Sequence, residues 1–404
     1  MQGLKRFLLE DKNTHLEHLE DEIINNGTQG AKTSIEFLKS IKKMLQGGKG
    51  GSNVSVKWDG APAVFAGTNP ENGRFFVGTK SIFNATPKIN YTVSDISRNH
   101  GGALADKLAV ALKYLPSLGI KGVLQGDLLF TDDKKNAVVG GERSIVFTPN
   151  TITYAVPATS ADMYDRIRAA KIGIIFHTSY SGKTMKGLKA SFGASVSGLK
   201  RNKNVFFDDA RYKQAEDPGF SKGEEKRFDA IIRMAEGSAY KAGAFIDKIK
   251  KDQGPLSLGV QLKTFFNTYI RSGTKIGNAK ALANNFEVFF RDRLKKEIDG
   301  KKQENTKQKY REILEAGMKI LRPNRQGLYF AIATYITLQT AKSLLLSKLN
   351  KIQSIGSFMR TSTGYRATSP EGYVAINKGN AVKLVDRLVF SQANFNVAKD
   401  WVRG

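Results

Sequence analysis

The sequence predicts an α+β fold in which antiparallel strands form the body of the protein. Short apolar runs, bounded by Gly, Pro and Asn, recur between residues 53 and 176. Helical spacing of apolar residues dominates residues 1–48 and returns in residues 216–359. A strand pair with a tight turn follows the second helical region, which indicates that those helices are inserted into the strand domain.

These changes of pattern divide the 404 residues into four parts. Two parts are helical, and two are stretches of one strand domain that the second helical part interrupts. We expect an N-terminal helical extension over 1–52, the first part of the strand domain over 53–215, a basic helical insertion over 216–359 and the C-terminal part of the strand domain over 360–404.

The N-terminal extension is expected to hold two helices. Asn13 or Thr14 can cap the first, which should end at the turn signal Asn25-Asn26-Gly27. The second should cover about Ala31–Leu45, and the glycine-rich segment 47–52 should separate it from the first strand.

The remaining elements follow from the same patterns. Strands are expected at 54–56, 63–65, 74–77, 122–130, 144–147, 151–156 and 172–176, with one helix over 103–115. The insertion should contain helices at 224–235, 240–250, 258–270, 279–298, 307–321 and 327–349. The closing hairpin should pair 372–376 with 381–385.

Charge is the strongest compositional signal. The chain carries 64 Lys and Arg against 37 Asp and Glu, a net charge of +27. Such an excess predicts a polyanionic partner, and nucleic acid is the leading candidate. The most apolar segment, 328–346, is interrupted by Thr, Gln and Lys, so we expect a core helix and no membrane contact. Without a visible secretory signal, the protein is expected to be a cytoplasmic monomer.

Residue types exclude several kinds of chemistry. The chain has no cysteine, which removes thiolate metal sites, disulfides and cysteine catalysis. Its four histidines also argue against a multi-histidine metal centre.

The run Val56-Lys57-Trp58-Asp59-Gly60 is the most informative motif. It places a lysine at the end of a short alternating strand and ahead of an acid and a glycine. A lysine can act as a nucleophile when apolar neighbours and nearby cations lower its pKa and free its lone pair. We therefore expect Lys57 to have a lowered pKa and to carry the chemistry.

This Lys-x-Asp-Gly spacing resembles the lysine motif of the covalent nucleotidyltransferases, which include the ATP-dependent DNA and RNA ligases and the mRNA capping enzymes. The resemblance implies an antiparallel-sheet nucleotidyltransferase domain of the ATP-grasp-like ligase type. It also implies that Lys57 accepts AMP from ATP as a phosphoramidate, with Mg²⁺ or Mn²⁺ as cofactor. Asp59 would orient the lysine loop or the ribose, and Gly60 would allow the close turn.

Three later runs match further motifs of these enzymes in the right order. Lys80, in Phe-Phe-Val-Gly-Thr-Lys-Ser, resembles the basic residue near the ribose and the incoming 5′-phosphate. Asp127, in Leu-Gln-Gly-Asp-Leu-Leu-Phe, takes the place of a glutamate and would bind the metal or the ribose hydroxyls. Phe176 resembles the aromatic residue that stacks on adenine, and His177 is the alternative.

The closing hairpin resembles the last two motifs. Glu371, in Glu-Gly-Tyr-Val, corresponds to the glutamate that serves the metal near the lysine. Lys383, in Ala-Val-Lys-Leu, corresponds to the lysine that contacts the α-phosphate. The resemblance covers residues 53–180 and 368–390, under half of the chain.

Four departures from the family pattern bear on the function. Pro62 stands where DNA ligases and capping enzymes usually have an arginine. Val385 stands where many members have a second lysine, and Arg387 is a candidate to compensate. Too few residues follow Lys383 for the OB-fold that normally closes over the site. The fourth departure is the helical insertion, which we expect to replace that domain as a nucleic-acid clamp.

The function that these matches imply is an ATP-dependent polynucleotide ligase, which forms a lysyl-AMP intermediate and joins 5′-phosphate and 3′-hydroxyl ends. DNA is slightly favoured by the Lys-Trp-Asp-Gly-Ala run, and RNA is the alternative because RNA ligases often lack an OB-fold. A capping guanylyltransferase is less favoured. A further alternative is a basic nucleic-acid-binding protein with a decayed nucleotidyltransferase fold. The run at 12–16, Lys-Asn-Thr-His-Leu, also resembles proteins of large tailed bacteriophages, which would place the protein in the host cytoplasm.

Overall fold

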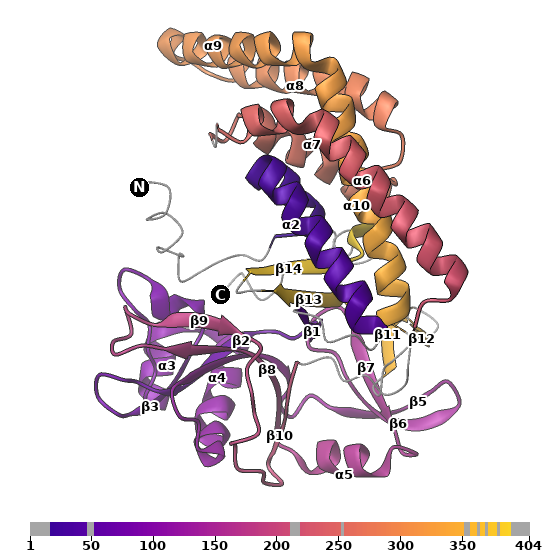
Figure 1. Ribbon diagram of the computed structural model, residues 1–404. Coiled ribbons are helices and arrows are strands. Elements are labelled where there is room, and N and C mark those ends of the chain that lie inside the picture. The colour runs from indigo at the N-terminus through magenta and orange to yellow at the C-terminus, as the bar shows by residue number, and fades with distance from the viewer. Residues whose placement is uncertain are drawn as a thin grey trace.

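The computed structural model holds three β-sheets and a layer of long helices, and the first sheet packs against that layer (Figure 1). The fold is mixed α and β with mainly antiparallel pairing, as the sequence predicts. The helix cap at Asn13 or Thr14 and most of the glycine-rich segment fall outside the described residues. The structure describes residues 17–46, 52–210, 219–251, 254–350, 356–361, 364–367, 371–377 and 380–388.

The first sheet holds the lysine strand and the closing hairpin. Its order is β1-β13-β14, and both pairs are antiparallel. One face packs on the helices through buried apolar side chains, and the other carries Lys57. The strands are β1 (Ser52–Lys57), β13 (Gly372–Asn377) and β14 (Asn380–Val385).

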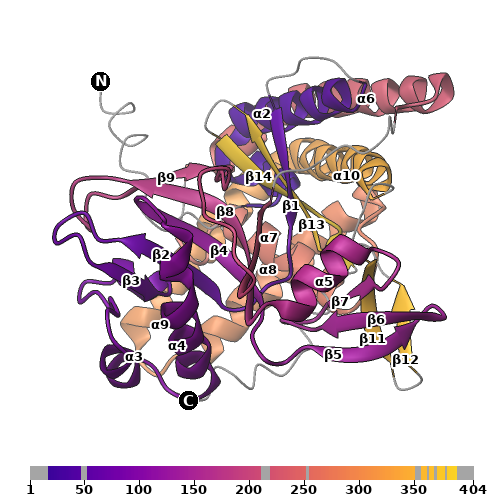
Figure 2. The same ribbon diagram turned by 90° about the horizontal axis from the view of Figure 1, so that it is seen from below.

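The second sheet has the order β10-β8-β4-β2-β3, with β9 paired to β8. Only its β10–β8 pair is parallel among the described strand pairs. Helix α4 (Gly102–Tyr114) covers one face and forms a core with it, and α3 (Val93–Asn99) lies beside α4 (Figure 2). The strands are β2 (Ala63–Thr68), β3 (Phe75–Gly78), β4 (Val123–Phe130), β8 (Ile172–Ser181), β9 (Lys189–Phe192) and β10 (Val205–Asp209).

The third sheet shows how the chain returns from the helices. Its order is β12-β11-β7-β6-β5, so β11, which follows the helical region, pairs with β7, which precedes it. The five strands are β5 (Lys135–Val139), β6 (Glu142–Phe147), β7 (Thr153–Pro157), β11 (Gly356–Thr361) and β12 (Gly364–Ala367), and α5 (Ala161–Ala169) packs beside them.

The helical layer joins the N-terminal and inserted helices in one core. Side chains of α2, α6, α7, α8 and α10 share this core with the back of the first sheet. The predicted extension and insertion therefore pack as one body, although the sequence separates them. The helices are α2 (Glu22–Leu45), α6 (Lys222–Ile249), α7 (Leu258–Arg271), α8 (Ala279–Asp299), α9 (Glu304–Leu321) and α10 (Arg325–Leu349). Short 3-10 turns are η1 (Leu19–Asp21), η2 (Lys80–Phe83), η3 (Leu115–Leu118) and η4 (Arg322–Asn324).

Three predicted helical segments differ from the structure. The expected first helix does not include His18, which is extended and bridges to Lys383, so helical backbone begins only with η1 and α2. Helix α6 is continuous where two helices were expected, because the buried stripe that faces α10 runs through the Gly237-Ser238 pair. At Gly27 the backbone leaves the helical region (φ 60°), as the turn signal predicts, but helix resumes at once. Among the described helices, none has the length and apolar content needed to cross a bilayer.

Candidate functional site

A cavity of about 200 Å³ lies between the first and second sheets. Strands β1 and β13 form one wall, and β4, β8 and β9 form the other. The motif residues Lys57 and Asp127 and the alternative base contact His177 all line it. The full lining is Ser55, Val56, Lys57, Gln125, Asp127, His177, Phe192, Val374 and Ile376.

Lys57 and Glu371 meet at one end of this cavity. Lys57 is the last residue of β1 and pairs in register with Gly372, so Glu371 precedes the pairing position. The Lys57 ammonium donates a hydrogen bond to the Glu371 carboxylate. A glycine is required at 372 because its φ is +152° and a Cβ there would lie 2.4 Å from the Leu384 carbonyl oxygen. The pairing register of β1 and β13 therefore brings Lys57 and Glu371 together.

The prediction that Lys57 has a lowered pKa is wrong. Burial does lower the pKa, but the negative charges of Glu371 and Asp127 outweigh it and raise the pKa above the ordinary lysine value. Burial raises the pKa of the Glu371 carboxyl, although Lys57 opposes that shift. The amine is thus a protonated ion-pair partner, and it becomes a nucleophile only when those negative charges are neutralised.

Lys383 supplies a second positive charge near Lys57. It lies on β14, opposite Val374 of β13, and cross-strand neighbours point to the same face of a sheet. Burial, and then the positive charge of Lys57, lower the pKa of Lys383. The two ammonium groups therefore lie close enough for their charges to interact.

Asp59 holds the loop that follows Lys57. Its side chain is 3% exposed and accepts four hydrogen bonds of 2.7 Å, two from backbone N–H groups and two from side chains. Its own N–H donates to the Tyr154 hydroxyl at 2.8 Å. The donors to the carboxylate are the Asn150 amide, the Thr151 N–H and hydroxyl, and the Ile152 N–H. These bonds fit the loop-orienting role, which is one of the two roles that the sequence leaves open for Asp59.

Replacing Asp59 with alanine is expected to destabilise the fold by about 3 kcal/mol, because several buried donors lose a charged acceptor. Urea unfolding of the variant measures the loss. Asp106→Ala, at an exposed position, serves as the control and should stay within about 0.5 kcal/mol of wild type. Equal stability of the two variants would contradict this role for Asp59.

Gly60 lets the lysine loop lie against β4. A Cβ at this position would fall 2.5 Å from the Cβ of Asp127, closer than packed atoms approach. The Ala61 N–H donates to the Leu128 carbonyl at 3.0 Å, and the Leu128 N–H donates to the Pro62 carbonyl at 3.1 Å. These bonds bring the loop and the Asp127 strand together, as the motif order implies.

Phe176 does not line the cavity. It is fully buried in the core between the second sheet and α4, so its assignment as the base platform is corrected. Residues Gln125 and Gly126 of β4 pair with Thr178 and Phe176, which leaves His177 as the extra residue of a β-bulge. Such bulges re-aim side chains, and here His177 faces the cavity with its Nε2 3.7 Å from Asp127 Oδ1.

Two other predicted residues lie away from the cavity lining. Lys80 is exposed at the start of η2, just after β3. Arg387, the candidate replacement for a second lysine, is 8% exposed and directs its guanidinium to Asp21, Tyr335 and Asn267. It therefore does not compensate for Val385 in the cavity.

Asp127 and Glu371, the two predicted metal ligands, suit a cation that takes its remaining ligands from phosphate and water. Asp127 and Glu371 are close enough that the charge of Asp127 raises the pKa of Glu371. Within the described residues, no group of three or more His, Asp or Glu side chains could hold a metal. Mg²⁺ is commonly bound by one or two carboxylates together with phosphate oxygens and water, which matches this pair.

Sequence reasoning missed two cavity residues, Phe192 and Gln125. Phe192 ends β9, a short strand whose burial pattern is mostly exposed, so no apolar run marks it. Gln125 lies two residues before Asp127, and the Tyr180 hydroxyl donates to its Oε1 at 2.8 Å. The alternation of β4 would have placed Gln125 beside Asp127 on one face.

Comparison with known proteins adds a family and no activity. Residues 13–399 match a family described as a family of unknown function, DUF6267. No curated protein sequence and no solved structure matches the chain. The chemistry of the site is therefore argued from its own residues.

Proposed function

The chain belongs to the DUF6267 family, whose function is unknown, and we propose from its site that it is a lysine-dependent nucleotidyltransferase that acts as an ATP-dependent polynucleotide ligase. One observation carries the proposal. Lys57, Asp127 and Lys383 come from three separate strands, and Glu371 immediately precedes a fourth. All four lie at motif positions of such enzymes and influence one another electrostatically near the cavity that Lys57 and Asp127 line. We likewise propose that the first two sheets form a nucleotidyltransferase domain.

In the first step, the Lys57 amine attacks the α-phosphorus of ATP. A nitrogen–phosphorus bond forms, the bond to the bridging oxygen breaks, and pyrophosphate leaves with that electron pair. The amine must first lose a proton. Glu371 is in contact with it, and burial raises the pKa of this carboxyl, so Glu371 is suited to accept that proton.

The charges around the cavity match the needs of this step. Asp127 and Glu371 would hold Mg²⁺ or Mn²⁺, whose positive charge would offset both the phosphate charge and the carboxylate charges that raise the pKa of Lys57. Lys383, whose ammonium lies near Lys57, would stabilise negative charge on the α-phosphate.

The cavity wall beyond these charges is suited to a planar base. Phe192 and Ile376 supply apolar surface, and the loop after β9 is held to His177 by hydrogen bonds from Gly193 and Ala194 to its carbonyl at 2.9 and 3.2 Å. We assign Phe192 the stacking role that Phe176 cannot fill, with His177 beside it.

In the later steps, a 5′-phosphate oxygen attacks the phosphorus of lysyl-AMP and the amine leaves. A 3′-hydroxyl then attacks the activated 5′-phosphate, the new phosphodiester forms and AMP departs. DNA is slightly favoured over RNA as the polynucleotide. We also propose the cytoplasm as its location.

The helical layer is our candidate for the polynucleotide surface. Residues 219–350 hold 26 Lys and Arg against 13 Asp and Glu, so this block contributes strongly to the net charge of +27. Helices α8 and α9 project from the layer beyond α7 (Figure 1). On α8, Lys280, Arg291 and Lys295 are exposed and spaced to share one helix face. Lysines and arginines on a projecting helix can neutralise backbone phosphates.

Changing these three α8 residues to glutamine is expected to weaken binding to a nicked DNA duplex. The slope of log affinity against log salt should fall by up to about 2.7, or 0.9 for each lost phosphate contact. Fluorescence anisotropy across a salt series measures this slope. Substitution is preferable to deletion of residues 216–359, because the deletion would expose the core that these helices share with α2 and the first sheet.

The matched control is glutamine at Lys135, Arg143 and Arg168, three exposed cations of the third sheet and α5. Both triple variants lose the same net charge. If they lose affinity equally, the α8 face is not a specific contact surface.

A single experiment tests the proposed activity and its alternatives. The protein is incubated with Mg²⁺ and ATP or GTP labelled at the α-phosphate, then separated under denaturing conditions. Label from ATP supports the ligase, and label from GTP supports a capping-type guanylyltransferase. No label from either nucleotide, together with retained nucleic-acid binding, supports a non-catalytic basic protein. Transfer of AMP to nicked DNA or to RNA ends then separates the two ligase substrates.

A further inference from the structure

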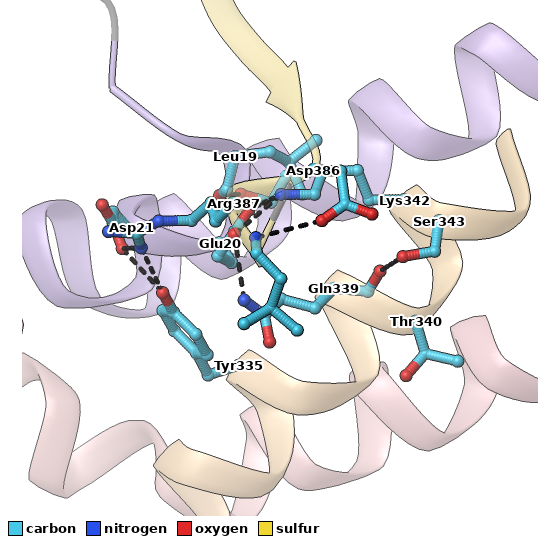
Figure 3. Close-up of polar contacts among 12 residues, drawn as sticks. Leu19, Glu20, Asp21, Tyr335, Gln339, Thr340, Lys342, Ser343, Asp386 and Arg387 are labelled. Atoms are coloured by element: carbon cyan, nitrogen blue, oxygen red, sulfur yellow. Dashed lines mark hydrogen bonds and ion pairs between the residues drawn. The ribbon is translucent and has the colours of Figure 1, made fainter. Parts of the chain in front are cut away.

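A buried network of charges joins the helical layer to the first sheet, behind the cavity (Figure 3). Its first pair is Glu20 and Lys342, which are 0% and 3% exposed. The Lys342 ammonium donates to both carboxylate oxygens of Glu20 at 2.7 Å, and the Gln339 amide donates to the same carboxylate at 3.2 Å. Glu20 precedes α2, whereas Lys342 and Gln339 lie on α10.

The second pair, Asp21 and Arg387, connects four segments. One guanidinium nitrogen of Arg387 donates to Asp21 at 3.2 Å and to the Tyr335 hydroxyl at 2.6 Å. The Tyr335 hydroxyl in turn donates to Asp21 at 3.1 Å, and the other guanidinium nitrogen donates to Asn267 of α7. Arg387 thus ties the chain just after β14 to η1 and to two helices.

The same N-terminal segment lies directly beside the site lysine Lys383. The Lys383 N–H donates to the Glu17 carbonyl at 2.9 Å, and His18 forms a parallel β-bridge with Lys383. Residues 17 and 18 therefore run beside β14, and the ion pairs of Glu20 and Asp21 anchor the 3-10 turn η1 that follows them. Lys383 lies between β13 and a segment that the helices hold in place.

Stability alone does not account for four buried charges. Removing ions from water is costly, and replacing a buried pair with apolar residues is often neutral or stabilising. Burial opposes ionisation of Glu20, but Lys342 outweighs it and lowers the pKa of Glu20 to about 2, so the pair stays charged at neutral pH. Directional contacts of this kind specify one arrangement where apolar packing tolerates several.

We infer that the Glu20–Lys342 and Asp21–Arg387 pairs are positioning contacts, which fix β14 and the ammonium of Lys383 relative to the helical layer. A displacement of α10 would thereby move the second ammonium group near Lys57. The catalytic meaning of this link rests on the proposed function, but the positioning itself does not.

The test separates positioning from stability with a paired substitution. The double variant Glu20→Met/Lys342→Met removes both charges of the pair and leaves neither one unpaired. Its urea midpoint should therefore be at or above that of wild type. Amide hydrogen exchange at Lys383 should nevertheless be at least about tenfold faster, because residues 17 and 18 are no longer held beside β14. Acylation of the Lys383 amine at one fixed pH, located by peptide mass spectrometry, should also be faster. Wild-type values for both readouts would overturn the inference.

A second variant decides the matter if the paired variant does not fold. Arg387→Lys keeps the charge but cannot reach Asp21, Tyr335 and Asn267 with one planar group, so the Lys383 amide should again exchange faster. Unchanged exchange in this variant would also overturn the inference. Arg311→Met, which removes an exposed ion pair with Glu304, should leave Lys383 at wild-type values. None of these measurements uses ATP, so they remain decisive for a protein that takes no nucleotide label.

Discussion

Replacement of Lys57 with alanine is expected to abolish covalent labelling by ATP, with a loss of more than about 10³-fold. The reason is chemical, because no other described cavity residue offers an amine beside both Glu371 and Asp127. Lys57→Arg should be equally inactive, since guanidinium keeps the positive charge but has no available lone pair. Denaturing electrophoresis after incubation with labelled ATP and Mg²⁺ measures both variants.

The matched control for this prediction is Lys80→Ala. Lys80 is a lysine of the same motif set but is exposed and outside the cavity lining, so initial labelling should stay within about threefold of wild type. Labelling that survives in Lys57→Ala would place the adduct on another residue and remove the basis of the proposal.

The second large effect is expected for Glu371→Gln. The variant keeps the shape of the side chain but loses the carboxylate that contacts Lys57 and would share the metal. The maximal labelling rate should fall by about 10²–10³-fold, the usual range for losing one preorganised electrostatic contact. Labelling rates across a Mg²⁺ series measure the change, and the dependence on Mg²⁺ should weaken.

The same variant makes a signed prediction about pH. The negative charge of Glu371 raises the pKa of Lys57, so removing it must lower that pKa. Only the neutral amine reacts, and the reactivity of Lys57 therefore rises as pH increases through its pKa. With an amine-specific reagent and no metal, the Glu371→Gln profile should lie at lower pH than the wild-type profile. Coincident profiles would show that Glu371 does not control the ionisation of Lys57.

Local patterns in the sequence were enough to predict most of the strands and helices near the site. The alternation of Val54 and Val56 placed Lys57 correctly on one face of β1, and the hairpin motif placed Glu371 opposite it. These predictions succeeded because side-chain direction in a strand depends only on parity, and the two-strand register follows from a short turn.

Other features depend on contacts that local patterns do not encode. The bulge that turns His177 toward the cavity and leaves Phe176 in the core arises from pairing between β4 and β8. The raised pKa of Lys57 depends on carboxylates more than 60 residues away along the chain. The contacts of Arg387 were also not predictable from local patterns, because its partners lie on η1, α7 and α10.

The central claim, that Lys57 is a covalent nucleotide acceptor, is tested most directly by mapping the adduct. The wild-type protein is incubated with ATP and Mg²⁺, denatured, digested at a pH that preserves phosphoramidates, and analysed by tandem mass spectrometry. We expect a single AMP adduct on the peptide that contains Val56-Lys57-Trp58, with its fragments placing AMP on Lys57. An AMP adduct on any other residue, or no adduct from ATP or GTP under these conditions, would contradict it.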